Sequence, residues 1–394
     1  MSKYRAYKTY MVSSTFEDVF HRQAQDYLGL RGKPEIKPAR GVWLVLLIGW
    51  APLPVLVLAQ MLAHKDPSML TFFSDFGVHC RSLLAAPLLM IAEKICLPRL
   101  AVVAEYFLSG GLIHESERER FEWAVTSTKA LGRSRIARIV AIVLSYVVVV
   151  AILNYVPPQV YPLWYSPGQR GYPDLSWASW WYALVSLPLL LTIIFSWCWR
   201  IACWLRFLFL VARLKLFLVP AHPDKAGGLG FLDLTLFAFM PLAFNLGLLF
   251  AGPLANHVLQ RHASISSFRV PVITLIVIVL LVFVSPLVLF AVNLRNQFRR
   301  GVLQYGGLAH EVGRQFEQKW FNRTIGPEAL EAPDFSATTD LLSIVGYSEE
   351  MRLLPFDLRP VIYLVAVSLL PFVPVVFMTI PVSVIVDEAV KLLL

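Results

Sequence analysis

The chain contains 394 residues, of which 57% are apolar and only 15% charged, and its mean hydropathy is +0.63. One water-soluble core of this length could not bury so many apolar side chains, so the composition excludes an ordinary soluble globular protein. The formal net charge of +9 requires no nucleic-acid partner, because basic residues beside a membrane lie where anionic headgroups attract them.

Seven stretches are long and apolar enough to cross a bilayer, which takes about 20 residues. In chain order they are residues 41–63, 83–108, 136–156, 178–199, 231–255, 271–293 and 361–386. The predicted fold class is therefore all-α: a polytopic transmembrane helix bundle of about seven spans, with two helices extended into the cytoplasm.

The orientation follows from the 35 Lys and Arg residues, because cytoplasmic flanks carry the basic excess. Most of them fall in the N-terminal tail and in every second loop after it. The N-terminus is therefore expected in the cytoplasm and the C-terminus outside. Residues 1–40 are polar and the first apolar stretch is long enough to span, so no cleavable signal peptide is expected.

Four regions are predicted along the chain. Residues 1–40 form a cytoplasmic tail with a short amphipathic helix from Thr15, and residues 41–293 hold spans one to six with a cytoplasmic extension at 200–230. Residues 294–360 form a cytoplasmic helical segment, and residues 361–394 hold the seventh span and a short outer C-terminus.

Two of these spans are expected to continue as helices into the cytoplasm. The apolar pattern after residue 199 predicts a helix as far as residue 219, and residues 294–322 carry apolar side chains at steps of three and four. This second stripe needs a partner, which could be the 200–219 helix or a neighbouring subunit.

Span two carries four ionisable residues, Glu93, Lys94, Arg99 and Glu105, around Pro98. Charges at membrane depth are costly, so they pair or face a water-filled cavity. Proline removes a backbone donor and frees a carbonyl that could line such a cavity. One interpretation is a permeation site at Glu93 and Lys94 with Arg99 as counter-charge; the other is a structural ion-pair cluster between spans.

Spans five and seven are interrupted by prolines, and span five also contains Asp233 and Asn245. Broken helices at membrane depth are tolerated where they are buried in protein or line a cavity. These residues are assigned to the same pathway, with proline kinks in a structural bundle as the competing explanation.

A glycine-rich loop precedes span five, with His222, Asp224, Gly227, Gly228 and Gly230. The glycines permit left-handed backbone conformations and close approach. His222 and Asp224 could form a cytoplasmic proton or ligand site. Alternatively, the loop is an ordered turn that the Asp224 side chain caps.

Three segments carry a family resemblance: HPDKAGGLGFL at 222–232, PDFSATTDL at 333–341 and MRLLPF at 351–356. They resemble a family of uncharacterised bacterial polytopic inner-membrane proteins. The resemblance covers the C-terminal half and implies a bacterial inner membrane. It implies no activity and no functional residue.

The leading functional hypothesis is a membrane channel or channel-like transporter for small ions, with a pathway near spans two, five and seven. A homo-oligomer in the lipid bilayer is expected, and no nucleic-acid partner. The alternatives are a signalling or assembly subunit that binds a protein through its cytoplasmic helices, and a membrane-embedded enzyme acting on lipid. The chain has no catalytic motif, and its four cysteines and eight histidines show no metal-ligand spacing, so neither an enzyme nor a metal or other cofactor is expected.

Overall fold

The computed structural model describes residues 38–157, 161–166, 174–261, 268–321 and 334–379. Within these ranges the regular structure is helical, and the only extended pairing is an isolated antiparallel bridge between Ile113 and Leu216. The all-α prediction is confirmed for this part of the chain. The predicted amphipathic helix from Thr15 lies outside the described residues.

Five helical stretches of the described chain are long and apolar enough to cross a membrane. They coincide with predicted spans one, three, four, five and six. Their bounds are Gly41–His64, Arg135–Tyr155, Trp177–Ala212, Gly230–Leu259 and Arg269–Trp320.

The first stretch comprises α3 (Pro38–Gly49) and α4 (Pro52–His64), separated by a break at Trp50 and Ala51. The second is α8 (Arg135–Tyr155). The third joins α9 (Trp177–Trp181) to α10 (Leu187–Ala212) through a π-helical turn. The fourth contains α11 (Asp233–Arg261). The fifth runs from α12 (Arg269–Val279) through π and 3-10 turns into α13 (Ala291–Trp320).

The two other predicted spans are also helical, but they are not among the five. Predicted span two lies in a helix that starts with α5 (Phe76–His79) and passes through a π turn into α6 (Ala86–Ser109). Predicted span seven begins in α15 (Leu358–Leu369), followed by α16 (Phe372–Phe377), and its last part lies outside the described residues. A count of seven spans therefore stays a prediction.

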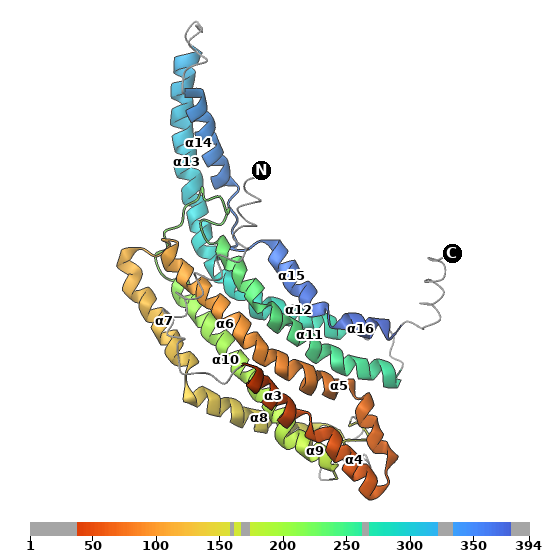
Figure 1. The fold of residues 1–394 in the computed structure, drawn as a ribbon. Coiled ribbons are helices and arrows are strands. Elements are labelled where there is room, and N and C mark those ends of the chain that lie inside the picture. Colours follow the sequence, from red (N-terminus) through yellow and green to blue (C-terminus); the bar gives the residue numbers. More distant parts are fainter. Residues whose placement is uncertain (1–37, 158–160, 167–173, 262–267, 322–333, 380–394) are drawn as a thin grey trace, which may run out of the picture.

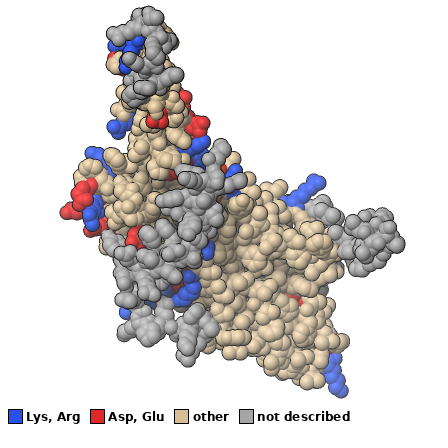
Figure 2. Space-filling view, turned by 45° about the horizontal axis from the view of Figure 1, so that its top comes forward, with Lys and Arg blue, Asp and Glu red and all other residues tan. Residues whose placement is uncertain are grey.

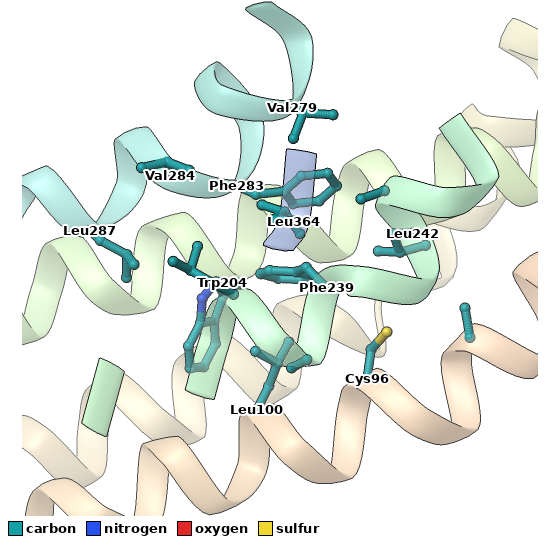
Figure 3. Packing of buried hydrophobic residues seen from close by; sticks show 14 of the residues in the cluster. Cys96, Leu100, Trp204, Phe239, Leu242, Val279, Phe283, Val284, Leu287 and Leu364 are labelled. Carbon is teal, nitrogen blue, oxygen red and sulfur yellow. The ribbon is translucent and has the colours of Figure 1, made fainter. Parts of the chain in front are cut away.

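Helix α11 occupies the middle of the bundle, with α6 along one side and α15 along another (Figure 1). Figure 3 shows how α6, α10, α11, α15 and the α12–α13 segment interlock through Leu100, Trp204, Phe239, Phe283 and Leu364. At Gly247 of α11 an added Cβ would lie 2.0 Å from the Ser368 carbonyl oxygen of α15. The two backbones therefore touch at this point.

The chain turns sharply after α10, and the predicted helix to residue 219 is wrong. Helix α10 ends at Ala212, and Phe217 and Val219 donate backbone hydrogen bonds to the carbonyls of Leu112 and Gly227. The side chains alternate between exposed and more buried from Arg213 to Val219. An alternation of period two is that of an extended segment.

Helix α13 continues past the end of α10 and forms a projecting hairpin with α14 (Asp334–Glu349), as Figure 1 shows. The helices run antiparallel, with Gly301 facing Ser348 near the base and Phe316 packing on Phe335 farther out. Within the chain, the partner of the 294–322 stripe is thus α14 rather than the expected 200–219 helix. At the base, Asn293 and Gln297 donate to the carbonyls of Ala212 and Leu218.

Helix α7 (Arg118–Gly132) lies antiparallel along the second half of α10. Phe121 packs on Phe207, Arg206 donates to Ser127, and the Trp199 indole donates to the Leu131 carbonyl. The outer side of α7 exposes charged residues, among them Arg118, Glu119, Arg120 and Glu122. The apolar helix α8 begins just after α7, at the level of Trp199.

Candidate functional site

The glycine-rich loop is organised around the Asp224 carboxylate. Its Oδ1 accepts from the backbone N–H groups of Ala226 (2.8 Å) and Gly228 (3.1 Å), and its Oδ2 accepts from Gly230 N–H (2.8 Å). Gly227 and Gly228 have φ of +63° and +99°, a region that glycine enters without steric cost. The interpretation of this loop as an ordered turn capped by Asp224 is confirmed.

The backbone hydrogen bonds to Asp224 favour its ionised form. Burial by itself raises the pKa of this carboxyl, but the three backbone donors and the neighbouring His222 together hold the pKa below its ordinary value. His222 Nδ1 lies 2.8 Å from Asp224 Oδ1. Because the oxygens of Asp224 are already occupied by donors inside the loop, this aspartate is suited to fixing the backbone rather than to carrying protons.

The segment after α14 closes over the same loop. Arg352 donates its backbone N–H to the Lys225 carbonyl (2.6 Å) and an Nη2 hydrogen to the Asp224 carbonyl (2.9 Å). Lys225 forms an ion pair with Glu350. Two of the segments that carried the family resemblance, 222–232 and 351–356, therefore contact each other directly.

Asp233, assigned to the ion pathway from the sequence, is also part of this junction. Its Oδ1 accepts a hydrogen bond from Asp357 N–H at 3.0 Å. Inside the junction, a Cβ on Gly227 would lie 3.0 Å from the Met351 methyl carbon, and one on Gly228 would lie 3.0 Å from Leu112. The loop, the Leu112 turn and the 350–357 segment therefore form one closely packed end of the bundle.

The charged residues of α6 are not brought together. Glu93 pairs with Arg200 of α10 (Nη2–Oε1 2.8 Å), and both side chains are about 30% exposed. The expected counter-charge Arg99 does not take this place: its guanidinium points towards the Phe237 carbonyl of α11, at 3.5 Å. Lys94 is exposed. This pair fits the interpretation of a structural ion pair between helices, with Arg200 of the neighbouring helix α10 as the partner of Glu93.

Glu105 and Asn245 lie apart from that pair. Glu105 is half-buried, and its Oε2 has no hydrogen-bond partner among the residues that the structure describes. It lies beside a hollow of about 310 Å³ that Ser109, Glu115 and Arg118 also line. Asn245 is 2% exposed within α11, and its amide donates to the Pro241 carbonyl (2.9 Å). The predicted pathway residues therefore occupy separate environments in the described structure.

Sequence reasoning missed a buried polar centre at the opposite end of the bundle. Asp75, 1% exposed, accepts from the Trp164 indole (2.9 Å), the Asn256 amide (2.7 Å) and Val78 N–H (3.1 Å). Asn256 in turn accepts from Gly77 N–H at 3.3 Å. The centre ties the 161–166 segment and α11 to the start of α5. The only sequence signal was an aspartate placed before an apolar helix, where such residues cap the first turn.

No protein-family model, curated protein or solved structure matches the chain. The class of protein is therefore inferred from the architecture of the chain. The described residues form a helical bundle with five helices able to cross a membrane, and no group of three or more His, Cys, Asp or Glu residues among them could hold a metal ion. The described part of the chain is thus an all-helical bundle of the kind found in membrane proteins.

Proposed function

We propose that this protein is a membrane-embedded assembly subunit, which binds a protein partner in the cytoplasm through the α13–α14 hairpin. The observation that carries the proposal is a two-helix projection beyond the bundle that keeps large apolar side chains exposed. Leu303 is 77% exposed, Leu342 58% and Leu308 50%. Apolar side chains that face water on a folded protein mark surfaces that bind another molecule.

The position of the membrane follows from α7. Its charged outer side cannot lie in hydrocarbon, so the bilayer begins where α8 begins. Trp199 and Arg200 of α10 lie at that level, because the Trp199 indole reaches Leu131 near the end of α7. The Glu93–Arg200 pair is then placed at the boundary of the bilayer rather than in its middle.

The hairpin lies farther out than this boundary. Asn293 of α13 contacts Ala212, the last residue of α10, and α10 has run a further 12 residues past Arg200 by then, about 18 Å at 1.5 Å per residue. Everything that α13 adds beyond that point is in water. Figure 2 agrees with this division, since charged side chains gather on the hairpin and around its base while a broad tan face covers the rest.

The excess of Lys and Arg at this end of the bundle favours the cytoplasmic side. In the described chain, Arg118, Arg133, Arg213, Lys225 and Arg299 all lie at this end. A cysteine placed at Gly307, where an added Cβ would meet no other atom within 4 Å, would then be labelled by a membrane-impermeant thiol reagent only after cells are opened.

Photo-crosslinking tests the binding role. A photoreactive amino acid replaces Leu303 or Leu342 in the full chain, and a matched control carries it at Ile139 of α8, which is 60% exposed on an apolar helix. Irradiated membranes should yield a protein adduct from the hairpin positions and none from the control. A hairpin that forms no protein adduct, in a protein whose folding is verified, contradicts the proposal.

The ion channel of the sequence analysis is the second candidate. The observation that favours it is the ion pair between Glu93 of α6 and Arg200 of the adjacent helix α10, with Lys94 and Arg99 also on α6. Current across a planar bilayer under a KCl gradient tests it. A reversal potential that differs between wild type and Glu93→Gln or Lys94→Met supports a pathway at this place, and an unchanged potential removes it.

A further inference from the structure

One side of the hairpin carries two stripes that match each other. On α13 the stripe consists of Arg299, Gly306 and Gly313, and on α14 it consists of Phe335, Leu342 and Glu349. Members of each stripe are seven residues apart, which is close to two helical turns, so each stripe follows one side of its helix.

Both stripes lie on the same side of the hairpin. The inward-facing positions include Tyr305 and Val312 on α13, and Leu341 and Ser348 on α14, which are all buried or half-buried. Each stripe residue Gly306, Gly313, Leu342 and Glu349 comes one position after one of these. Because the helices are right-handed and antiparallel, one step past the inward position turns towards the same side on both helices.

The stripes are open and complementary in shape. A Cβ added at Gly306 or Gly313 would meet no atom within 4 Å, and Leu342 is 58% exposed. Phe335 packs its ring on Phe316 and Trp320 of its own hairpin and is still 47% exposed. The α13 stripe therefore leaves space above its two glycines, and the α14 stripe presents large apolar side chains that are partly exposed. A glycine inside a helix costs about 1 kcal/mol relative to alanine, which close packing by another chain would offset.

The stripes are also in register. Gly301 faces Ser348, with 3.8 Å between their Cβ positions. Counting outward from that pair along antiparallel helices, Arg299 is level with Glu349, Gly306 with Leu342 and Gly313 with Phe335, each to within about one residue. Each glycine of α13 is thus level with a large apolar side chain of α14, and the basic Arg299 is level with the acidic Glu349.

We propose that the partner of the hairpin is a second copy of this chain, docked stripe to stripe as a four-helix bundle about a two-fold axis along the membrane normal. Two copies in one membrane project their hairpins in the same direction, so this axis sets α13 of one copy beside α14 of the other at equal height. Leu342 then covers Gly306 of the second copy, Phe335 covers Gly313, and Glu349 meets Arg299, each contact occurring twice.

The charges of α13 and α14 favour a second copy of the chain over an unrelated protein as the partner. Helix α14 contains no Lys or Arg, and its side chains include Asp340 and Glu349, whereas the base of α13 carries Arg295, Arg299 and Arg300. A pairing of α13 with α14 brings opposite charges together, and a pairing of like helices would oppose them. The inference rests on the proposed function, because it names the partner of the same hairpin.

Co-purification of two differently tagged copies tests the dimer in the full-length protein. We expect Arg299→Glu alone and Glu349→Arg alone each to lower the recovery of the second tag about tenfold, since each creates two like-charge contacts per dimer. The double variant, and also a mixture of one single variant with the other, should recover it, because both restore opposite charges. Asp340→Arg, on the other side of α14, is the matched control and should leave recovery unchanged.

Gly306→Leu separates dimerisation from folding. Leucine favours the helix more than glycine does, and its Cβ would meet no atom within 4 Å in a single copy, so the variant should fold as well as wild type yet lose the second tag. Recovery unaffected by Gly306→Leu, or charge reversals without mutual rescue, overturns the proposal. Crosslinks from Leu342 to a different protein, with no co-purified second copy, overturn it while leaving the proposed function standing; the absence of any hairpin crosslink overturns both.

Discussion

Replacement of Asp224 should loosen the glycine-rich loop in a graded way. In Asp224→Asn one side-chain oxygen remains, so the bonds from Ala226 and Gly228 can persist while the bond from Gly230 is lost. A hydrogen bond to a charged group contributes roughly 1.5–3 kcal/mol, so we expect a loss of about 2 kcal/mol. Asp224→Ala removes all three bonds and should cost about twice as much.

Hydrogen exchange measured by mass spectrometry on the detergent-purified protein reports the loss where it occurs. The amides of Ala226, Gly228 and Gly230 should exchange faster in Asp224→Asn and fastest in Asp224→Ala. Glu119→Gln, which neutralises an exposed carboxylate of α7, is the control and should leave these amides unchanged. Unaltered exchange in Asp224→Ala would refute the view that this carboxylate holds the loop.

The same comparison has a defined pH dependence. Because the pKa of Asp224 is lowered in the folded protein, the carboxylate contributes stability that is fully present above the unfolded-state pKa of about 3.9 and is lost as the pH falls through the folded-state value. The difference between wild type and Asp224→Asn should stay constant above about pH 5 and shrink below pH 4. A difference that grows on acidification contradicts the assignment.

Three further changes test the packing of the bundle through apparent melting temperatures in detergent. Gly247→Ala places a methyl group 2.0 Å from a backbone oxygen of α15 and should destabilise by about 1–3 kcal/mol; an unchanged melting temperature would show that α11 and α15 can separate freely. Arg200→Met should cost about 1–2 kcal/mol by leaving Glu93 unpaired, and adding Glu93→Gln should recover part of it if the two residues are coupled. Asp75→Ala should cost about 2–4 kcal/mol, because it leaves the Asn256 amide and other buried donors without an acceptor; a neutral result would show that water replaces the carboxylate.

The membrane helices were predictable because hydropathy over about 20 residues is a local property. The end of α10 was not recognised, although the signal was present. Residues 213–219 are apolar enough to continue a helix, but Lys215, Phe217 and Val219 alternate with Leu214, Leu216 and Leu218, which is the period of an extended segment.

The candidate site was predictable only in its local part. An aspartate followed by glycines indicates a capped turn within a few residues, and Asp224 forms that turn. Arg352 lies 128 residues further along the chain, and no local pattern connects it to the loop. The same holds for Arg200, which replaced Arg99 as the partner of Glu93, because helix neighbours in a bundle are set by tertiary packing.

The bonds between Arg352 and the loop also constrain the order in which the protein can be completed. During synthesis, α10 and α11 can enter the membrane while residues 350–357 are still inside the ribosome. Until those residues emerge, the carbonyls of Asp224 and Lys225 lack the donors that Arg352 brings, and Asp233 lacks the N–H of Asp357. A chain that stops before residue 350 would therefore present an open, protease-accessible loop, and the contacts that close it form only after residues 350–357 have left the ribosome.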